Sequence, residues 1–142
     1  MSAFRIYLRV VSSRLPPEEI SDRLGTEPDS AYAVGSRRRP QARPRNHTSW
    51  MRHATAPGTP ERPEDLEPVI LGWGMDFASA VGDLVESGDA TAMLEIVQEI
   101  RDLEDVQAKG IFLSEELITW LSTAQASIDI DQYILHDCAE DD

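Results

Sequence analysis

The stretch FRIYLRVVSSRLPPEEISDRLG, residues 4–25, joins a strand pattern to a helix pattern and indicates the fold class. Its first seven residues alternate, with the apolar side chains Phe4, Ile6, Leu8 and Val10 on one face and Arg5, Tyr7 and Arg9 on the other. This alternation predicts a strand with one buried face. A helix is predicted next, because Pro16 and Pro17 suit a first helical turn and Gly25 follows the last apolar residue.

A long apolar stripe follows in the middle of the chain. From Leu66 to Val85 the apolar residues recur at spacings of three and four, which is typical of one face of a helix. Gly72 and Gly74 lie inside this stripe, and glycine weakens a helix interior. We therefore expect a kink or a close packing contact near Trp73.

The last third of the chain predicts two strands, a short strand-like run and a helix. Residues 93–101 fit both a strand and a helix, and we favour the strand. A short strand-like run, 111–113, precedes Ser114, whose hydroxyl can cap a helix over residues 115–125. Residues 127–135 alternate again and predict a final strand, with Ile128, Ile130 and Ile134 on one face and Asp129, Asp131 and Tyr133 on the other.

Together these elements predict an α+β domain with a single, mostly antiparallel sheet of about four to five strands and two or three helices packed mainly on one face. The domain is expected to span residues 1–135 and to be followed by an acidic tail, 136–142. An arginine- and proline-rich loop is expected at about 27–63. A short strand at about 49–53 is expected to interrupt it, because the apolar side chain of Trp50 is too large to be left unpacked in a loop.

The charge of the chain limits the classes of partner. The formal net charge is −13, and duplex nucleic acids bind proteins mainly through lysine and arginine, so a nucleic-acid partner is not expected. No apolar run reaches the length of a membrane span. The single cysteine, Cys138, cannot form an internal disulfide, which predicts a cytoplasmic location.

Several segments together resemble a known bacterial family of unknown function. They are PEEISDRLGTEPD near the start, a single tryptophan after a variable loop, a long central helix, and GIFLSEELITWL followed by SIDIDQY. This arrangement resembles domain of unknown function 4279. The resemblance implies a compact α+β domain and brings no catalytic residues with it. Some members look like immunity proteins that neutralise a partner toxin, and the arginine-rich insert departs from the family pattern.

The first and last strands carry candidate binding residues on their polar faces. Asp129 and Asp131 are about 7 Å apart on one strand face, a spacing that suits acid/base or metal chemistry. Arg5, Tyr7 and Arg9 form the mirror-image pattern, so that neighbouring strands would pair these faces by charge and by ring. We favour a solvated or salt-bridged surface over a reaction centre.

The predicted loop carries the second set of candidates: Arg37, Arg38, Arg39, Arg43 and Arg45. Guanidinium groups bind phosphate and carboxylate in a two-pronged manner. Three alternatives stay open: a solvated loop, contact with an acidic surface of this or another copy, and contact with nucleic acid. Trp50, beside these arginines, could anchor an interface.

No catalytic or cofactor motif accompanies these residues. The soft metal ligands His47, His53, His136 and Cys138 lack the paired spacing of a zinc site, and no cofactor is expected. We expect binding rather than catalysis, by a protein-interaction domain that engages a basic protein partner. The alternative is a small-molecule or anion-binding regulatory domain that uses arginine side chains, and an undiscovered enzyme ranks third.

Overall fold

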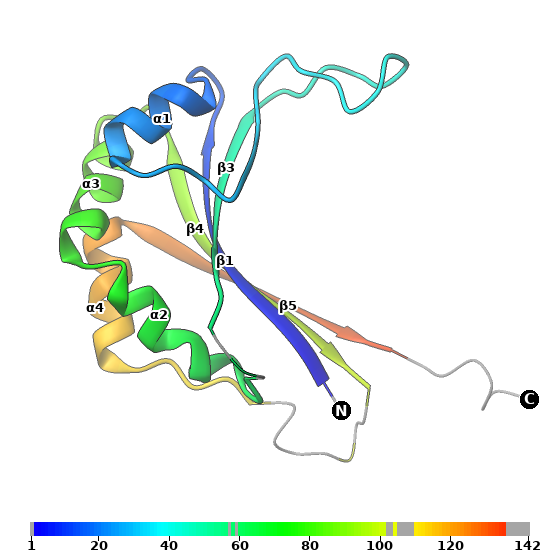
Figure 1. The fold of residues 1–142 in the computed structure, drawn as a ribbon, viewed down its shortest axis with the longest axis vertical. Coiled ribbons are helices and arrows are strands. Elements are labelled where there is room, and N and C mark those ends of the chain that lie inside the picture. The colour runs from blue at the N-terminus through cyan, green and yellow to red at the C-terminus, as the bar shows by residue number, and fades with distance from the viewer. Residues whose placement is uncertain (1, 57, 59, 102–103, 105–109, 136–142) are drawn as a thin grey trace, which may run out of the picture.

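The computed structural model shows one five-stranded sheet with helices on a single face (Figure 1). It describes residues 2–56, 58, 60–101, 104 and 110–135, so that the expected acidic tail lies outside the described residues, as do His136 and Cys138. The strands are β1 (Ser2–Ser12), β2 (Ser30–Tyr32), β3 (Thr48–Ala54), β4 (Thr91–Ile100) and β5 (Ala126–Ile134), and the helices are α1 (Pro17–Leu24), a 3-10 turn (Pro63–Leu66), α2 (Glu67–Gly72), α3 (Met75–Glu86) and α4 (Glu115–Ala124).

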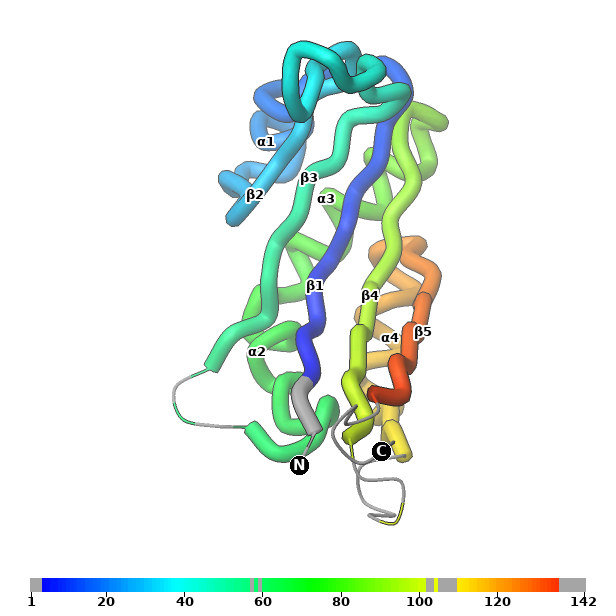
Figure 2. The backbone as a smooth tube through the Cα atoms, turned by 90° about the vertical axis from the view of Figure 1, so that its right-hand side faces the viewer, coloured from blue at the N-terminus to red at the C-terminus, as the bar shows by residue number. Residues whose placement is uncertain are grey.

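The order of the strands across the sheet is β2-β3-β1-β4-β5 (Figure 2). All neighbouring pairs are antiparallel except β4 and β5, which run parallel. A parallel pair needs a crossover connection, and the connection from β4 to β5 contains α4. The predicted α+β class and the mostly antiparallel sheet are confirmed.

The alternation in β1 is confirmed. Ile6, Leu8 and Val10 are buried beneath the helices, and the polar residues between them lie on the other face. Residues 93–101 are ambiguous in sequence because β4 is buried on both faces: Glu95 and Val97 on the open side are buried, as are Leu94 and Ile96 under the helices. A strand buried on both faces loses the alternation that would identify it.

The predicted central helix is present but broken near Trp73, as expected. Gly74, with φ of 91°, separates α2 from α3, and this left-handed conformation favours glycine. The break brings the carbonyl of Gly74 to the indole Nε1 of Trp120, which donates to it at 3.1 Å. Because the predicted helix is divided in two, the structure has more helices than the two or three expected.

Two segments differ from the sequence-based expectation. β2 was not predicted, because its three residues are too few to show an alternation, and it pairs with β3 alone. The run 111–113 is not a strand: both sides of β4 are already occupied, by β1 and β5, and Ile111 and Leu113 pack instead against the core.

α3 and α4 cross at very close range. A Cβ on Gly82 of α3 would lie 2.2 Å from the backbone oxygen of Thr123 in α4, well inside van der Waals contact. The helix backbones can approach this closely only where no side chain separates them. Gly82 therefore sets the distance between these two helices.

We expect Gly82→Ala to lower the free energy of unfolding by about 1–3 kcal/mol, because the helices must move apart to admit the methyl group. Urea unfolding followed by tryptophan fluorescence measures the change. Gly72→Ala is the matched control, because its added methyl group meets no atom within 4 Å outside its own stretch of helix, and it should be neutral or stabilising by up to about 1 kcal/mol. Equal stability of the two variants would contradict the close contact.

Candidate functional site

The face of the sheet opposite the helices is polar, and no described helix covers it (Figure 1). This open face carries Arg5, Tyr7 and Arg9 from β1, Ser49 and His53 from β3, Glu95, Val97 and Glu99 from β4, and Asp129, Asp131 and Tyr133 from β5. All six candidates predicted on the first and last strands thus share one surface. We call this surface the open face.

The first and last strands are not neighbours, and this corrects the predicted pairing of their charges. β4 lies between them, with Glu95 opposite Tyr7 on one side and opposite Asp129 on the other. Glu95 of β4 therefore pairs with Arg9, the residue that the sequence-based prediction pairs with the aspartates of β5. Among the described residues, no ion pair engages Asp129 or Asp131.

A polar cluster occupies the middle of the open face. Arg9 Nη1 lies 3.6 Å from Glu95 Oε1, and Arg9 Nε donates to Ser49 Oγ at 2.9 Å. The ring of Tyr7 lies 5.2 Å from that of His53, centroid to centroid. Glu95 is only 8% exposed, so that its charge depends on Arg9 and Tyr7 for compensation. The cluster ties β3, β1 and β4 together.

Burial raises the pKa of the Tyr7 phenol to about 12, and the hydrogen bond to Glu95 and the negative charge of Glu95 add to the effect. Arg9 and Arg5 act in the opposite direction. The raised pKa extends into alkaline pH the range over which the Tyr7 hydroxyl stays protonated and donates to Glu95.

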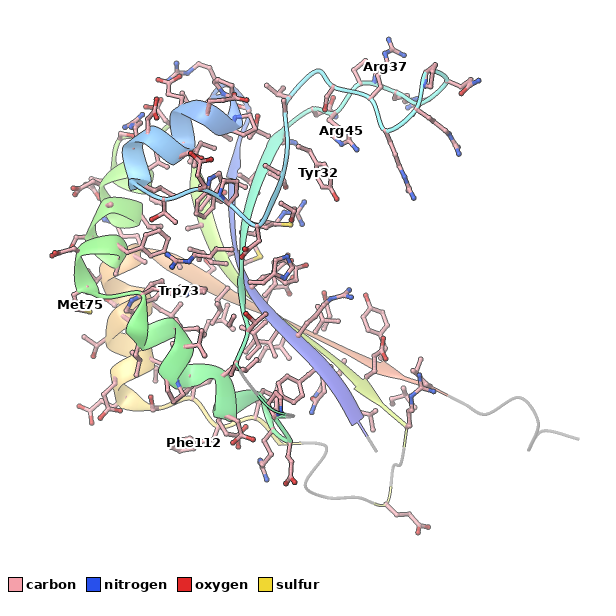
Figure 3. All side chains as sticks on the ribbon, viewed as in Figure 1. Tyr32, Arg37, Arg45, Trp73, Met75 and Phe112 are labelled. Atoms are coloured by element: carbon pink, nitrogen blue, oxygen red, sulfur yellow. The ribbon has the colours of Figure 1, made fainter. Side chains whose placement is uncertain are left out.

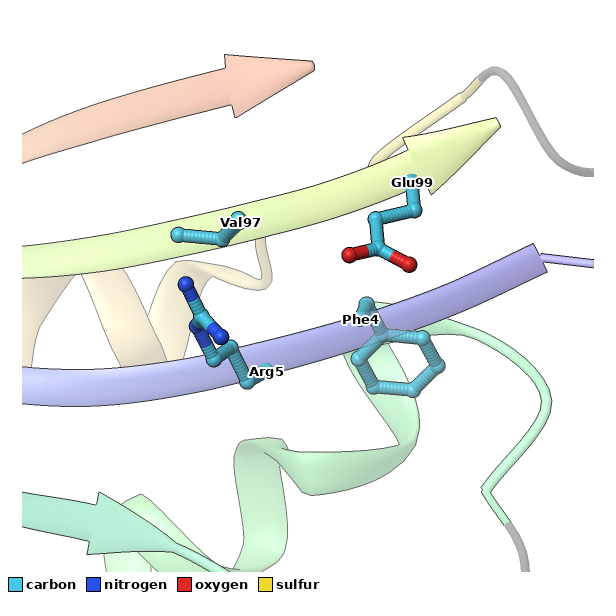
Figure 4. A pocket seen from close by; sticks show the side chains of 4 residues that line it. All are labelled: Phe4, Arg5, Val97 and Glu99. Atoms are coloured by element: carbon cyan, nitrogen blue, oxygen red, sulfur yellow. The ribbon is translucent and has the colours of Figure 1, made fainter. Parts of the chain in front are cut away.

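Arg5 lies over a shallow hollow between β1 and β4 (Figure 4). The hollow has a volume of about 90 Å³ and is lined by Phe4, Arg5, Val97 and Glu99. Arg5 and Arg9 do not converge there with the two aspartates, because Val97 and Glu95 separate them across the sheet. The candidate residues of β1 and β5 are therefore spread over an extended surface.

The arginine-rich loop forms a long hairpin between β2 and β3, which we call the arginine hairpin (residues 33–47). It projects away from the sheet, with Arg37 far from the strands and Arg45 near its base (Figure 3). Arg45 stacks over Tyr32 at 4.4 Å from the ring centroid, and backbone hydrogen bonds join Gly35 to Arg45 and Arg45 to Ser36. Arg38, Arg39 and Arg43 are exposed. The hairpin arginines are thus separate from Arg5.

Trp50 cannot anchor an interface, which corrects one sequence-based alternative. Its side chain is fully buried under the helices, where Nε1 donates to Ser21 Oγ at 3.0 Å. Trp50 lies opposite Val10 of β1, on the helix-covered face of β3, and this position explains its burial. Trp50 is a core residue beside Phe77, at a centroid distance of 6.3 Å.

Sequence reasoning missed two charged residues of structural importance. Glu95, the carboxylate that organises the open face, could have been found from its place between the apolar residues Leu94 and Ile96 of a predicted strand. Arg52 lies against Trp73 and Phe77, at 4.7 and 4.8 Å from their ring centroids, and no sequence pattern pointed to that contact. Burial lowers the pKa of Arg52, and the charge of Asp29 opposes this shift.

Among the described residues, no group of three or more His, Cys, Asp or Glu side chains is arranged to hold a metal ion. None of the described helices is long and apolar enough to reach across a bilayer. The fold and the open face define a class: a small α+β domain whose sheet is covered by helices on one side only.

Within that class the chain belongs to the family described as Domain of unknown function (DUF4279), whose model matches residues 2–135. This match confirms the resemblance found in the sequence. Comparison with curated proteins and with solved structures gave no match.

Because of Tyr7, the free energy of unfolding of the domain is expected to vary with pH in the alkaline range. Because the folded-state pKa of about 12 exceeds the ordinary value of 10.0, the unfolded chain loses this proton first as the pH rises. The contribution of Tyr7 to stability is therefore complete below pH 10 and is lost between pH 10 and 12. We expect wild type to lose more free energy of unfolding than Tyr7→Phe over this range, as measured by urea unfolding at each pH. Parallel losses in the two proteins would contradict the raised pKa.

Proposed function

We propose that this domain is a non-enzymatic protein-interaction module that binds a basic protein partner, in the manner of an immunity protein that neutralises a toxin. One observation carries the proposal. The β5 side of the open face carries Asp129 and Asp131, which no described cation neutralises, beside Tyr133, whose side chain is 54% exposed. Unpaired carboxylates beside an exposed aromatic ring suit the binding of a cationic surface.

The distribution of charge supports the same partner chemistry. Six of the 13 basic residues lie between residues 30 and 60, a range that contains no acid, so the rest of the chain has 7 bases (13 − 6) against all 26 acids. A field of this sign attracts a basic partner at long range and speeds its encounter. The arginine hairpin projects from the sheet (Figure 3), while the aspartates lie on its last strand, so the two charges are segregated.

The shape of the open face favours a macromolecule over a small substrate. Ligand pockets in proteins commonly enclose about 300–1,000 Å³, whereas the hollow beside Arg5 holds about 90 Å³ and is open to solvent. A broad, rigid strand surface is suited to a second protein surface. A cytoplasmic location belongs to the same proposal, because the chain has a single cysteine.

Affinity capture with matched variants tests the proposal. Wild type, Asp129→Asn/Asp131→Asn, and the control Asp22→Asn/Asp83→Asn are immobilised and exposed to a lysate of the organism that encodes the domain. The control removes two exposed aspartates from α1 and α3 and so changes the net charge equally. We expect wild type and control to retain a basic protein that the β5 variant loses, and about 1 M NaCl to release it, because the Debye length is then only about 3 Å.

Two results would contradict the proposal. One is a captured protein that the β5 variant retains as well as wild type does. The other is the retention of acidic proteins only, which would move the binding surface to the arginine hairpin.

A second function, the binding of an anionic small molecule, is favoured by one observation: the arginine hairpin exposes Arg37, Arg38, Arg39 and Arg43 with no acid among them. This function predicts that inorganic pyrophosphate raises the melting temperature of wild type and not that of a variant with these four arginines changed to alanine. Differential scanning fluorimetry makes the comparison, with Asp129→Asn/Asp131→Asn as the control that keeps the response. An unchanged melting temperature of wild type removes this function.

A further inference from the structure

β5 is the last strand of the sheet, and within the described part of the chain no strand lies on its outer side (Figure 2). The N–H of Leu135 donates to the carbonyl of Ile100 at 2.9 Å, so residue 135 points its backbone groups toward β4. Backbone groups alternate in direction along a strand. Those of Ile128, Ile130 and Ile134 therefore point outward, away from β4, where a further strand would bind.

The same isoleucines present an apolar surface at this edge. Ile128, Ile130 and Ile134 lie on the helix side of the sheet, yet their side chains are 37%, 43% and 52% exposed. Ile118 of α4 faces the same region and is 53% exposed. An open hollow of about 350 Å³ lies between α4 and β5, lined by Ile118, Leu121, Ser122, Ala126 and Ile128. The helical layer thus leaves the outer part of β5 uncovered.

The opposite side of the edge is acidic. Asp129 and Asp131 alternate with the isoleucines and lie on the open face. The outer edge of β5 therefore offers three features at a strand spacing: outward backbone groups, apolar side chains toward α4, and carboxylates toward the open face. An incoming strand would meet all three together.

Charge argues against a second copy of this chain as the occupant. In an antiparallel pair of β5 strands with full overlap, the centre is Ile130 and Asp129 of each copy lies opposite Asp131 of the other. Two pairs of like charges would then face one another across the strands, which is destabilising. Charges on an edge strand commonly prevent such self-association.

We infer that the outer edge of β5 accepts an extended segment of the partner as a sixth strand, and that basic and apolar residues alternate in this segment. The inference rests on the proposed function and specifies how the basic partner binds. Main-chain hydrogen bonds to the outward groups of β5 hold the segment. Its arginine or lysine side chains lie beside Asp129 and Asp131, and its apolar side chains cover Ile128 and Ile130 and enter the hollow beside Ile118.

Hydrogen exchange with a synthetic peptide tests this mode of binding. The probe is the capped peptide TVRVRVT, whose alternation reads the same in either strand direction, and the control peptide TVVRRVT has the same composition without the alternation. We expect the probe to slow the exchange of the Ile128 and Ile130 amides by at least about tenfold at saturation, as observed by NMR, because these N–H groups become hydrogen-bonded. The amides of Asp129 and Asp131, which already face β4, should change little.

Variants of the domain provide the matched comparison. Asp129→Asn/Asp131→Asn should weaken binding of the probe by about three- to tenfold, because two cross-strand charge pairs are lost. Asp22→Asn/Asp83→Asn should leave it unchanged. Ile118→Ser, at an exposed position that adds little to the core, should also weaken binding while the melting temperature stays within about 2 °C of wild type.

The outcomes separate this inference from the proposed function. Strand addition is wrong if the probe binds without slowing the exchange of the outward amides. It is also wrong if neither peptide binds at about millimolar concentration. In both cases the proposed function stands as long as a captured partner still requires Asp129 and Asp131. Strand addition is likewise wrong if the outward amides of the free domain are protected and lose protection on dilution, which would identify a second copy as the occupant. If the probe protects the outward amides of β5 but the capture experiment yields no basic partner, β5 accepts an added strand and the proposed function is wrong.

Discussion

The antiparallel pairing of β1 with β4 is the interaction on which the other parts of this structure depend. It places Ile6 beside Ile96 and Leu8 beside Leu94 beneath the helices. A shift of β1 by one residue would turn Ile6 and Leu8 to the open face, so burial fixes the register. The same register places Glu95 beside Tyr7 on the open face, near Arg9, and the polar cluster follows directly from the packing of the core.

The helices cover one face only, and aromatic side chains hold them there. Trp73, Phe77 and Trp120 form a set of ring contacts with centroid distances between 5.9 and 6.2 Å. The break at Gly74 allows α2 and α3 to follow the twisted sheet, and Gly82 lets α4 approach α3 closely. A layer of this width does not extend over the outer part of β5, whose isoleucines stay partly exposed.

Separation of charge follows from the topology of the sheet. β4 lies between the arginines of β1 and the aspartates of β5, and it contributes the carboxylate that neutralises Arg9. Consequently no described cation pairs with the aspartates of the last strand. The arginine hairpin extends from the β2 side of the sheet, so that one small domain presents a cationic projection and an acidic edge in different places (Figure 1).

The sequence by itself determined the local elements, because alternation, helical spacing and capping act between residues close in the chain. It identified β1, α1, the broken central helix, the cap of α4 at Ser114, whose Oγ accepts from the N–H of Leu117, and β5 with its two unlike faces. Only the tertiary structure decided which strands became neighbours. Strand order depends on loop closure and on burial over long separations, which no local pattern records. For that reason the sequence placed Asp129 and Asp131 on the correct face but paired them with the wrong strand, left β2 unrecognised, and could not show that Trp50 lies in the core.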